Sequence, residues 1–482
     1  MFRFDNSFAR DLPGFYLESV AEPASDPQLC CYNDALSDAL GVDRSGLSDA
    51  ALAAMLVGNQ PIAGSQPLAF AYAGHQFGTF NPQLGDGRAL LLGEHVTPAG
   101  ERVDVQLKGS GRTPFSRGGD GRAALGPVLR EFLISEAMAA LDIATTRALA
   151  VVTTGDRVWR DRPLPGAVLT RIAASHLRIG TIEFFAAHDG ADAVRKIADY
   201  ALNRHFPYLA GAANPPLALL DAVIAGQCTL VARWMAVGFV HGVMNTDNMT
   251  LSGETIDYGP CAFVDSYAAD RVFSSIDTGG RYAFGRQPPI LHWNMARLAE
   301  ALLPAIMTVD PEGQEAAVAL INAIPNRYTG VMLSEMRRKL GLTSEEAEDA
   351  ALVQSLFAAM EGQAIDFTQF FATLTAIAAG EARGTFAPAM SEWIARWQGR
   401  RGRDRADPHL AVATMRRANP HIIPRNHMVE AALSDAVERS DFAAFHRLLA
   451  EIRDPWRPRA AGDPFAAPPA TDAPPYVTFC GT

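Results

Sequence analysis

Two kinds of hydrophobic periodicity divide this chain of 482 residues. Between residues 84 and 173 apolar side chains alternate over short runs, which is typical of half-buried strands. Within that region RALLLGEHV and RVDVQLK are joined by TPAGE, whose Pro and Gly favour a turn, so the two runs predict an antiparallel hairpin. From about Thr181 onward apolar residues recur at helical spacing, interrupted only around residues 239 to 266. A β-rich part followed by a mostly helical part predicts an α+β fold.

Further strands and one helix are expected between the hairpin and the helical region. A Gly- and Arg-rich loop, GSGRTPFSRGGDGRAALG, leads into VLREFLISEAMAALDI, whose apolar residues follow the spacing of an amphipathic helix. The runs RALAVVTTGDRVWR and GAVLTRIA then return to strand character. The first 60 residues are expected to be an extension rather than an independent domain. The tail from residue 461 is rich in Pro and Ala and is expected to be extended and loosely packed.

Composition limits the partners and the compartment. The chain has 42 Lys and Arg against 53 Asp and Glu, a net charge of -11, so any site for phosphate must be local and diffuse binding to nucleic acid or anionic lipid is not expected. Its five cysteines show no CxxC pair and no zinc-type spacing. The first twenty residues lack the apolar core of a signal peptide, and the apolar stretch at 222 to 232 is too short to span a bilayer. We therefore expect a cytoplasmic monomer without a membrane span.

Candidate phosphate-binding groups lie in the predicted β-rich part. Gly85 and Gly87 would let the backbone approach a phosphate closely, although an ordinary glycine turn in a hairpin is the favoured interpretation of this fragment taken alone. Lys108 ends an alternating run, where its ammonium can face a cleft. A Lys on a strand that pairs with a Glu on the next helix is how protein kinases hold nucleotide phosphates. Glu131 and Glu136 on the predicted helix are both possible partners.

The most specific stretch of the chain runs from Phe239 to Asp265. In protein kinases an Asp two residues after a His is the base, an Asn five residues later binds metal, and an Asp-Phe-Gly follows. His241, Asn248 and Asp257-Tyr258-Gly259 fit this frame, but the position of the base holds Val243, which cannot accept a proton. Asp247, directly before Asn248, is the candidate base, and it is expected to be ionised at pH 7 with an ordinary pKa. Asn248 and Asp257 are candidate ligands for a hard divalent cation.

Two arginines follow the last predicted strand. Arg171 and Arg178 are seven residues apart, which on a helix would place them on one face, although the preceding GAVLT favours a strand leading into them. Two guanidiniums that converge on a polyphosphate would stabilise a departing anion. His176 between them is expected to be structural.

These motifs together resemble those of the SelO family, also called YdiU. The resemblance rests on Gly85-Asp86-Gly87-Arg88, Lys108, GGDGR at 118 to 122, the two arginines and HGVMNTDNM followed by IDYGP, and it extends over essentially the whole chain. It includes the terminal CGT, where Cys480 stands at the position of a selenocysteine in eukaryotic members.

The resemblance implies a protein-kinase-like bilobal fold. Its parts would be an N-terminal extension (residues 1–60), a β-rich N-lobe (61–170), a helical C-lobe (171–460) and a tail (461–482). It further implies a protein adenylyltransferase that binds ATP in an orientation inverted relative to kinases and transfers AMP to Ser, Thr or Tyr hydroxyls with Mg²⁺, releasing pyrophosphate. Asp247 would accept the proton, Asn248 and Asp257 would hold the metal, and Glu131 would pair with Lys108. The implied ATP contacts are Gly85, Gly87, Arg88, Lys108, Asp120, Gly121, Arg171, Arg178 and Asp257.

Three alternatives stay open at this point. The chain could be a kinase that moves the γ-phosphate, a non-catalytic ATP-binding pseudokinase, or a uridylyltransferase that uses Mn²⁺. Val243 argues against the kinase, and retention of the base, both metal ligands, the Lys and both Arg argues against a non-catalytic protein. The resemblance also implies redox chemistry at Cys480, with Cys261 as one possible disulfide partner. The protein targets leave no signal in the sequence.

Overall fold

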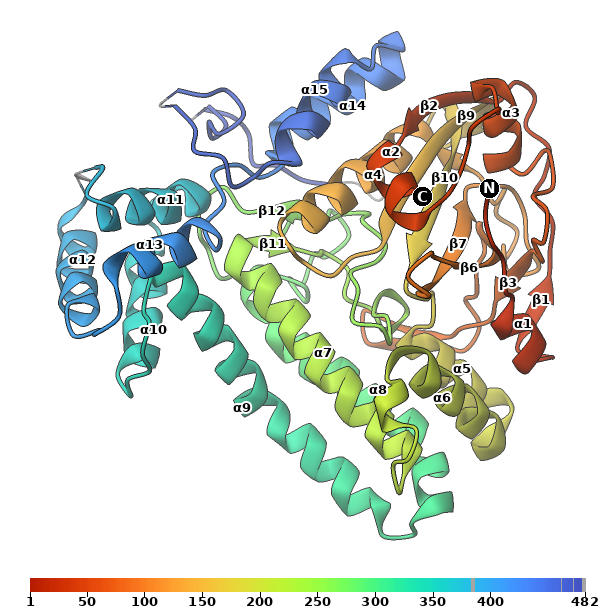
Figure 1. Cartoon of the computed structure of the whole chain (residues 1–482), viewed down its shortest axis with the longest axis horizontal. Helices are drawn as coiled ribbons and strands as arrows, with labels where there is room; N and C mark the ends of the chain where they lie inside the picture. The colour runs from red at the N-terminus through yellow and green to blue at the C-terminus, as the bar shows by residue number, and fades with distance from the viewer. Residues whose placement is uncertain (383–385, 461, 471, 479–482) are drawn as a thin grey trace.

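An eight-stranded antiparallel sheet forms the right-hand part of the molecule in Figure 1. The computed structural model describes residues 1–382, 386–460, 462–470 and 472–478. The strand order is β1-β3-β6-β7-β10-β9-β2, with the short β8 paired to β10. The strands are β1 (Tyr16–Glu18), β2 (Gln28–Tyr32), β3 (Leu68–Phe70), β6 (Ala89–Val96), β7 (Arg102–Lys108), β8 (Ala123–Ala124), β9 (Arg147–Trp159) and β10 (Pro163–Ala173).

The predicted hairpin is confirmed as β6 and β7, and the predicted strands that follow form a second hairpin, β9 and β10. β7 also pairs with β10, so Lys108 lies between Ala89 on one side and Leu169 on the other, inside the sheet. In the same register Arg171 stands opposite Gln106. Because side chains alternate across a strand, Gln106 and Lys108 share one face of the sheet with Arg171.

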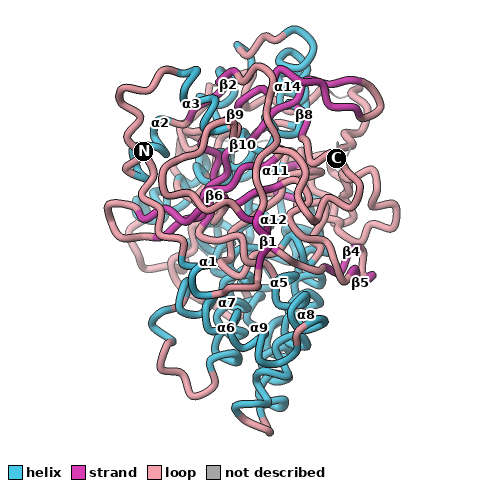
Figure 2. The backbone as a smooth tube through the Cα atoms, turned by 90° about the vertical axis from the view of Figure 1, so that its right-hand side faces the viewer, coloured by secondary structure: helices cyan, strands magenta, loops and turns pink. Residues whose placement is uncertain are grey.

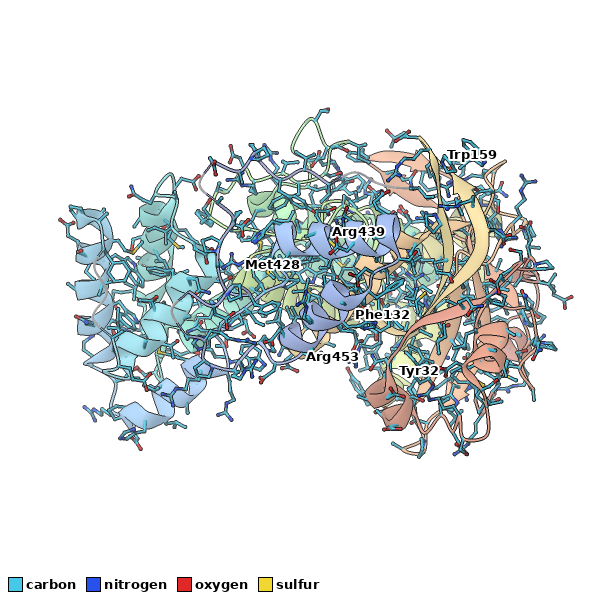
Figure 3. All side chains as sticks on the ribbon, turned by 90° about the horizontal axis from the view of Figure 1, so that it is seen from above. Tyr32, Phe132, Trp159, Met428, Arg439 and Arg453 are labelled. Atoms are coloured by element: carbon cyan, nitrogen blue, oxygen red, sulfur yellow. The ribbon has the colours of Figure 1, made fainter. Side chains whose placement is uncertain are left out.

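Helix α4 (Leu125–Ala140) confirms the predicted amphipathic helix and packs on β9 and β10. It buries a nearly continuous apolar surface together with Glu131, whose relative exposure is 4%. On its other side Phe132 meets Phe445 of α15 (Ala443–Ile452), with ring centroids 6.2 Å apart. Figure 3 shows Phe132 beside α15 and the neighbouring α14 (Asn426–Arg439), with Trp159 at the far end of the β9–β10 hairpin. The C-terminal helices therefore hold α4 against the sheet.

Helices dominate the chain after residue 178, as the periodicity predicts. The long α7, α8 and α9 run side by side below the sheet in Figure 1, and α10 to α13 form a separate group at the left. The bounds are α1 (Ser7–Asp11), α2 (Asp34–Leu40), α3 (Asp49–Leu56), α5 (Ile179–His188), α6 (Gly190–His205), α7 (Pro215–Val237), α8 (Gln287–Val309), α9 (Gly313–Leu340), α10 (Asp349–Met360), α11 (Phe367–Ala378), α12 (Pro388–Arg401) and α13 (Pro408–Arg416).

The expected interruption near residues 239 to 266 is present. The two-residue strands β11 (Phe239–Val240) and β12 (Ala262–Phe263) pair and close a loop that carries Asp247 and Asp257. A second small hairpin, β4 (Gly74–Gln76) with β5 (Thr79–Asn81), lies outside the large sheet at the edge of the molecule in Figure 2. Short 3₁₀ turns occupy Pro207–Leu209, Thr246–Asn248 and Phe284–Arg286.

Within the described ranges, α7 is the one helix long and apolar enough to cross a membrane. It is longer than the apolar stretch recognised in the sequence, because the whole segment from Pro215 to Val237 is helical. Most of its apolar side chains are buried in the core, where α7 packs against α8 and α9. A buried core helix of a folded protein has these same properties.

The two ends of the chain are attached to this framework. β1 and β2, both within the first 60 residues, form the two outer strands of the large sheet. The expectation of a loosely packed tail is wrong for the part that the structure describes. The Tyr476 hydroxyl donates to Glu430 Oε1 at 2.6 Å, and Thr478 forms an isolated β-bridge with Ser274. Hydrogen bonds from a few polar residues hold this segment in spite of its Pro and Ala.

Candidate functional site

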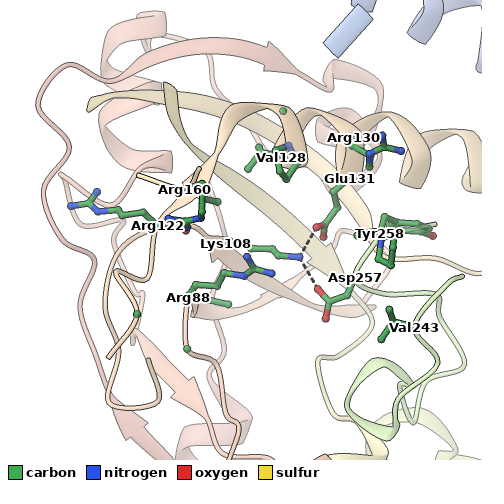
Figure 4. A pocket seen from close by; sticks show the side chains of 18 of the residues that line it. Arg88, Lys108, Arg122, Val128, Arg130, Glu131, Arg160, Val243, Asp257 and Tyr258 are labelled. Atoms are coloured by element: carbon green, nitrogen blue, oxygen red, sulfur yellow. Dashed lines mark hydrogen bonds and ion pairs between the residues drawn. The ribbon is translucent and has the colours of Figure 1, made fainter. Parts of the chain in front are cut away.

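Five charged side chains from five segments of the chain converge below the sheet, as Figure 4 shows for three of them. Lys108 Nζ donates to Glu131 Oε2 at 2.6 Å and to Asp257 Oδ1 at 2.7 Å. Arg171 Nη1 donates to Glu131 Oε1 at 3.0 Å and to Asp257 Oδ1 at 2.8 Å. Arg178 Nη1 donates to Asp257 Oδ2 at 2.8 Å. Three cations thus surround one carboxylate of the loop.

Local structure explains how each side chain reaches this point. Arg171 lies in β10, and Arg178 precedes α5 as its N-cap. The interpretation that both arginines lie on one face of a helix is therefore wrong, and the prediction of a strand leading into them is confirmed. Asp257 has φ of +63°, in the left-handed region that a residue with a Cβ rarely adopts. This conformation turns its carboxylate back toward the cations, and such strain persists where surrounding contacts enforce it.

Two supporting side chains, Gln106 and Tyr72, were missed by the sequence reasoning, and a third, Asp86, was named there only as part of a motif. Gln106 Oε1 accepts from Arg171 Nη2 at 2.6 Å, and Gln106 Nε2 donates to Asp86 Oδ2 at 3.1 Å. The guanidinium of Arg178 stacks on Tyr72 at 4.6 Å from the ring centroid. A signal for Gln106 was present, since it stands two residues before Lys108 and alternation places both on the same, polar face of the strand.

Burial and charge act against each other at the acidic groups. Burial opposes ionisation of Asp257, but Lys108, Arg171 and Arg178 outweigh it and hold the pKa of Asp257 well below its ordinary value. The same balance lowers the pKa of Glu131. At Asp86 burial wins and raises the pKa to about 6. Asp257 and Glu131 are therefore the ionised carboxylates that balance the cations.

Asp247 lies in the loop beside this cluster, with its backbone carbonyl accepting from Arg178 Nη1 at 2.7 Å. Its Oδ1 is buried without a hydrogen-bond partner, and Gln76 Nε2 approaches Oδ2 at 3.4 Å. Burial raises the pKa of Asp247 to about 7, so the expectation of an ordinary pKa is wrong. Its neighbour Asn248 donates through Nδ2 to the carbonyl of Val243 at 3.0 Å, which leaves the amide oxygen as an acceptor.

The predicted glycines line the same cleft but have a packing reason of their own. A Cβ on Gly85 would lie 2.2 Å from the ring of Phe115, and one on Gly87 would lie 2.9 Å from the Phe115 carbonyl oxygen. Gly121, at φ +66°, packs equally tightly on the carbonyl of Gly111. These contacts fix the shape of the loop that covers one side of the cleft.

The remaining predicted residues lie at the rim or around it. Asp120 Oδ2 accepts from Arg160 Nη1 at 2.8 Å, and Arg88 extends into the cleft beside Lys108 (Figure 4). Glu136, the alternative partner for Lys108, instead accepts from Arg147 Nε at 2.7 Å. The cleft as a whole has a volume of about 1000 Å³ and runs from the charged cluster to α14.

Two other sequence expectations concern His176 and Cys480. His176 is buried with Nδ1 at 3.0 Å from Asp104 Oδ2, which is the structural role expected of it. Cys480 lies outside the described residues. Its suggested partner Cys261 is fully buried, and burial raises the pKa of the Cys261 thiol to about 12.

Comparison with known proteins gives a consistent answer. A family model described as Protein adenylyltransferase SelO matches residues 2–453. The chain belongs to the SelO family. A relative from Sphingopyxis alaskensis is 57% identical over 486 residues, covering 100% of both chains, and is named Protein nucleotidyltransferase YdiU. Relatives with the same name from Rhizobium rhizogenes and Geobacillus kaustophilus are each 51% identical, covering 99% and 100% of this chain and 97% and 99% of their own. The chain is therefore an enzyme of the nucleotidyltransferase class.

Proposed function

We propose that this chain transfers AMP from ATP to Ser, Thr or Tyr hydroxyls of proteins and releases pyrophosphate. The observation that carries the proposal is the convergence of Lys108, Arg171 and Arg178 on one point of the cleft, next to a buried carboxylate that is not the kinase base. Three cations can neutralise a leaving pyrophosphate. The α-phosphorus of ATP would then face Asp247.

The residues present fit a divalent metal ion. Asn248 and Asp257 are oxygen donors, as Mg²⁺ and Mn²⁺ prefer, and the orphaned Oδ1 of Asp247 shows that this part of the loop has unused acceptor capacity. No group of three or more His, Cys, Asp or Glu gathers at a metal-binding distance in the described residues. That is expected of a magnesium site which nucleotide phosphates and water complete. When bound, the metal would supply positive charge at the phosphates.

The chemistry at the protein side is a simple displacement. The acceptor hydroxyl gives its proton to the Asp247 carboxylate, and its oxygen bonds to the α-phosphorus. The bond from that phosphorus to the oxygen bridging the β-phosphorus breaks, and both electrons leave with pyrophosphate. A base whose pKa is about 7 is well matched to this step, because it is substantially ionised at neutral pH and still basic enough to take the proton.

A protein-kinase-like fold with inverted ATP belongs to this proposal. Its support is the Lys108–Glu131 pair between a central strand and α4, and the Asp257-Tyr258-Gly259 segment beneath it. Residues 1–60, 61–170, 171–460 and 461–482 would be its extension, N-lobe, C-lobe and tail. The contacts of Gly85, Gly87, Arg88, Asp120 and Gly121 with ATP are part of the same proposal. A cytoplasmic monomer that binds neither nucleic acid nor membrane remains a prediction.

Parallel incubations with α-labelled and γ-labelled ATP test the transferred group. Each incubation contains the full chain, MgCl₂ and a mixture of acceptor proteins. The acceptor proteins should acquire label from the α position only, with one pyrophosphate released for each AMP transferred. Label from the γ position would make the chain a kinase and refute the proposal. An incubation with α-labelled UTP and MnCl₂ tests uridylyl transfer. Comparing the rates of UMP and AMP transfer then shows which nucleotide is the preferred substrate.

A further inference from the structure

The β4–β5 hairpin is fastened to the loop of the proposed base by three consecutive residues. The backbone N–H of His75 donates to Thr246 Oγ1 at 2.7 Å, Gln76 reaches Asp247, and the backbone N–H of Phe77 donates to Asn245 Oδ1 at 3.1 Å. His75 Nδ1 also lies 2.6 Å from Glu183 Oε1, and Thr246 Oγ1 donates to the other oxygen of Glu183 at 2.6 Å. Anything that binds this hairpin is thereby held at a fixed place relative to Asp247.

The turn of this hairpin exposes an aromatic residue in a conformation that does not suit it. Phe77 and Gly78 have φ of +51° and +86°, the pattern of a turn in which Asn or Gly normally stands first. Phe77 nevertheless holds the position with 38% of its surface exposed, and it lines the cleft together with Gln76 and Ile276, which is 52% exposed. One edge of the ring packs against Tyr282, with ring centroids 5.1 Å apart, and the rest of it stays exposed, so this strained position is a candidate for function.

Phe77 is part of a larger surface, which we call the hairpin face. His75 packs against Phe80 and Trp293 at ring-centroid distances of 4.9 and 5.3 Å. Phe80 is 39% exposed. The guanidiniums of Arg281 and Arg297 lie over Trp293 at 4.7 and 5.0 Å from the ring centroid. The hairpin face consists of His75, Phe77, Phe80, Arg281, Trp293 and Arg297.

The charge of the hairpin face is positive. Arg297 pairs with Glu300 at 2.6 Å, whereas Arg281 forms no ion pair with any of the described residues and its buried Nε and Nη2 have no hydrogen-bond partner. In a chain with a net charge of -11, an unneutralised arginine on an aromatic surface beside the cleft is a place where an acidic partner gains both charge and apolar contact.

We infer that the hairpin face docks the acceptor protein, through an extended segment in which the hydroxyl residue has an apolar and an acidic neighbour. This inference rests on the proposed function. The apolar neighbour would contact Phe77 and Phe80, and the acidic neighbour would pair with Arg281. Among the residues that the structure describes, β5 pairs with β4 alone, so its other edge can add the segment as a further strand, which uses main-chain hydrogen bonds for affinity and alternate side chains for specificity. The hydroxyl is then carried to Asp247 by the fixed geometry of the hairpin.

Two synthetic peptides and the full chain test the inference. Both are fluorescein-labelled 13-residue peptides with a central Tyr flanked by Leu, and they differ only in carrying Glu or Lys at the flanking charged positions. Fluorescence anisotropy measures their affinity, and α-labelled ATP with MgCl₂ measures transfer in parallel. The wild type should bind the Glu peptide roughly tenfold more tightly than the Lys peptide, the effect of about one charge-assisted contact.

Two variants separate docking from folding. Arg281→Glu should reverse the order of the two peptides, which a loss of structure would not do. Phe77→Asn suits the turn better, so its thermal midpoint should be equal or higher while both peptides bind roughly tenfold more weakly. Arg195→Glu on the exposed face of α6 and Tyr208→Ala, at another exposed aromatic, are matched controls that should leave peptide binding unchanged.

The outcomes distinguish the inference from the function on which it rests. Equal binding of the two peptides by the wild type, or an unchanged order in Arg281→Glu, overturns docking at the hairpin face. A dimer in size-exclusion chromatography that Phe77→Asn dissociates would assign this face to a second copy of the chain and also overturn it. Tighter binding of the Glu peptide by the wild type, with the order reversed in Arg281→Glu but no transfer of α-label, would support docking and refute only the proposed AMP transfer. Transfer to both peptides at equal rates would leave AMP transfer standing and reject the docking site.

Discussion

Arg178 Nη1 donates to Oδ2 of Asp257 at 2.8 Å, and the same nitrogen donates to the backbone carbonyl of Asp247 at 2.7 Å. One guanidinium therefore connects the proposed metal ligand to the proposed base. The guanidinium is planar and rigid, and its stacking on Tyr72 fixes the orientation of its plane. Any change in the position of Arg178 must move both carboxylate-bearing segments.

Arg178→Lys should slow the transfer of α-label by roughly ten- to hundredfold, because one ammonium on a flexible stem cannot keep both contacts and the stacking on Tyr72. Steady-state transfer rates at saturating ATP measure the change, and thermal unfolding checks that the fold persists. Arg162→Lys is the control, since Arg162 forms an exposed pair with Glu438 that contributes little. A wild-type rate in Arg178→Lys would show that this bridge has no part in transfer.

Gly74→Ala should abolish transfer while ATP still binds. A Cβ at Gly74 would lie 2.4 Å from Asp247 Oδ1 and 2.9 Å from its Cγ, so the carboxylate has to move. A displacement of about 1 Å at a reacting group typically costs roughly a hundredfold in rate. Calorimetric titration with ATP and the α-label assay measure the two properties separately, with Asp247→Ala as the reference for complete loss of the base.

The control for that substitution is Gly330→Ala. Gly330 is in the interior of α9 with open space around its would-be Cβ, so the variant should be more stable by roughly 0.5–1 kcal/mol and equally active. If Gly74→Ala transferred AMP as fast as Gly330→Ala, the role assigned to the Asp247 carboxylate would be wrong.

Local periodicity was sufficient to predict the elements that carry the site. The β6–β7 hairpin, α4 and the last two strands of the sheet each follow from a short local pattern in the sequence. Choosing between Glu131 and Glu136 was beyond such patterns, because both are buried on α4 and only the packing of that helix on the sheet decides which one meets Lys108.

The electrostatic state of the site was also out of reach. Asp257 is surrounded by Lys108, Arg171 and Arg178 only because three distant segments meet, and the burial that raises the pKa of Asp247 to about 7 has no sequence signal. The hairpin that holds Gln76 against Asp247 spans eight residues outside any long periodic run, so it was not predicted.

Glu254→Gln should stabilise the fold at neutral and higher pH but not in acid. Glu254 Oε2 accepts from the Ala174 N–H and the Ser252 hydroxyl, each at 2.9 Å, and burial raises its pKa from 4.5 to about 7. A raised pKa in the folded state means that stability is fully present below pH 4.5 and is lost as the pH rises toward 7. A Gln keeps an oxygen for both donors and does not ionise.

Urea unfolding of both proteins between pH 4.5 and 8 measures this effect. The free energy of unfolding of the variant minus that of the wild type should grow through this window and level off above about pH 7, at roughly 1–3 kcal/mol. A difference that is independent of pH would mean that the pKa of Glu254 is the same in the folded and unfolded states.

Oxidation is expected to join Cys480 to Cys261 and to lower transfer. The Thr478 hydroxyl donates to the carbonyl of Pro260 at 2.9 Å. Pro260 directly precedes Cys261, and Thr478 stands two residues before Cys480. Because burial raises the pKa of Cys261, the Cys480 thiol is the better target for an oxidant. With glutathione disulfide the two thiols lose two protons and two electrons in total, and two reduced glutathione molecules form.

The measurement is a non-reducing gel together with the α-label assay. Oxidised wild type should migrate faster than the reduced protein, and dithiothreitol should restore both its mobility and its activity, whereas Cys480→Ala should respond to neither reagent. Cys30→Ala is the control, since Cys30 lies in β2 with its Sγ at 3.7 Å from the Gln28 carbonyl, and this variant should respond as the wild type does. Equal activity and mobility of oxidised and reduced wild type would reject the disulfide without touching AMP transfer, because none of the residues that hold nucleotide, metal or proton is a cysteine.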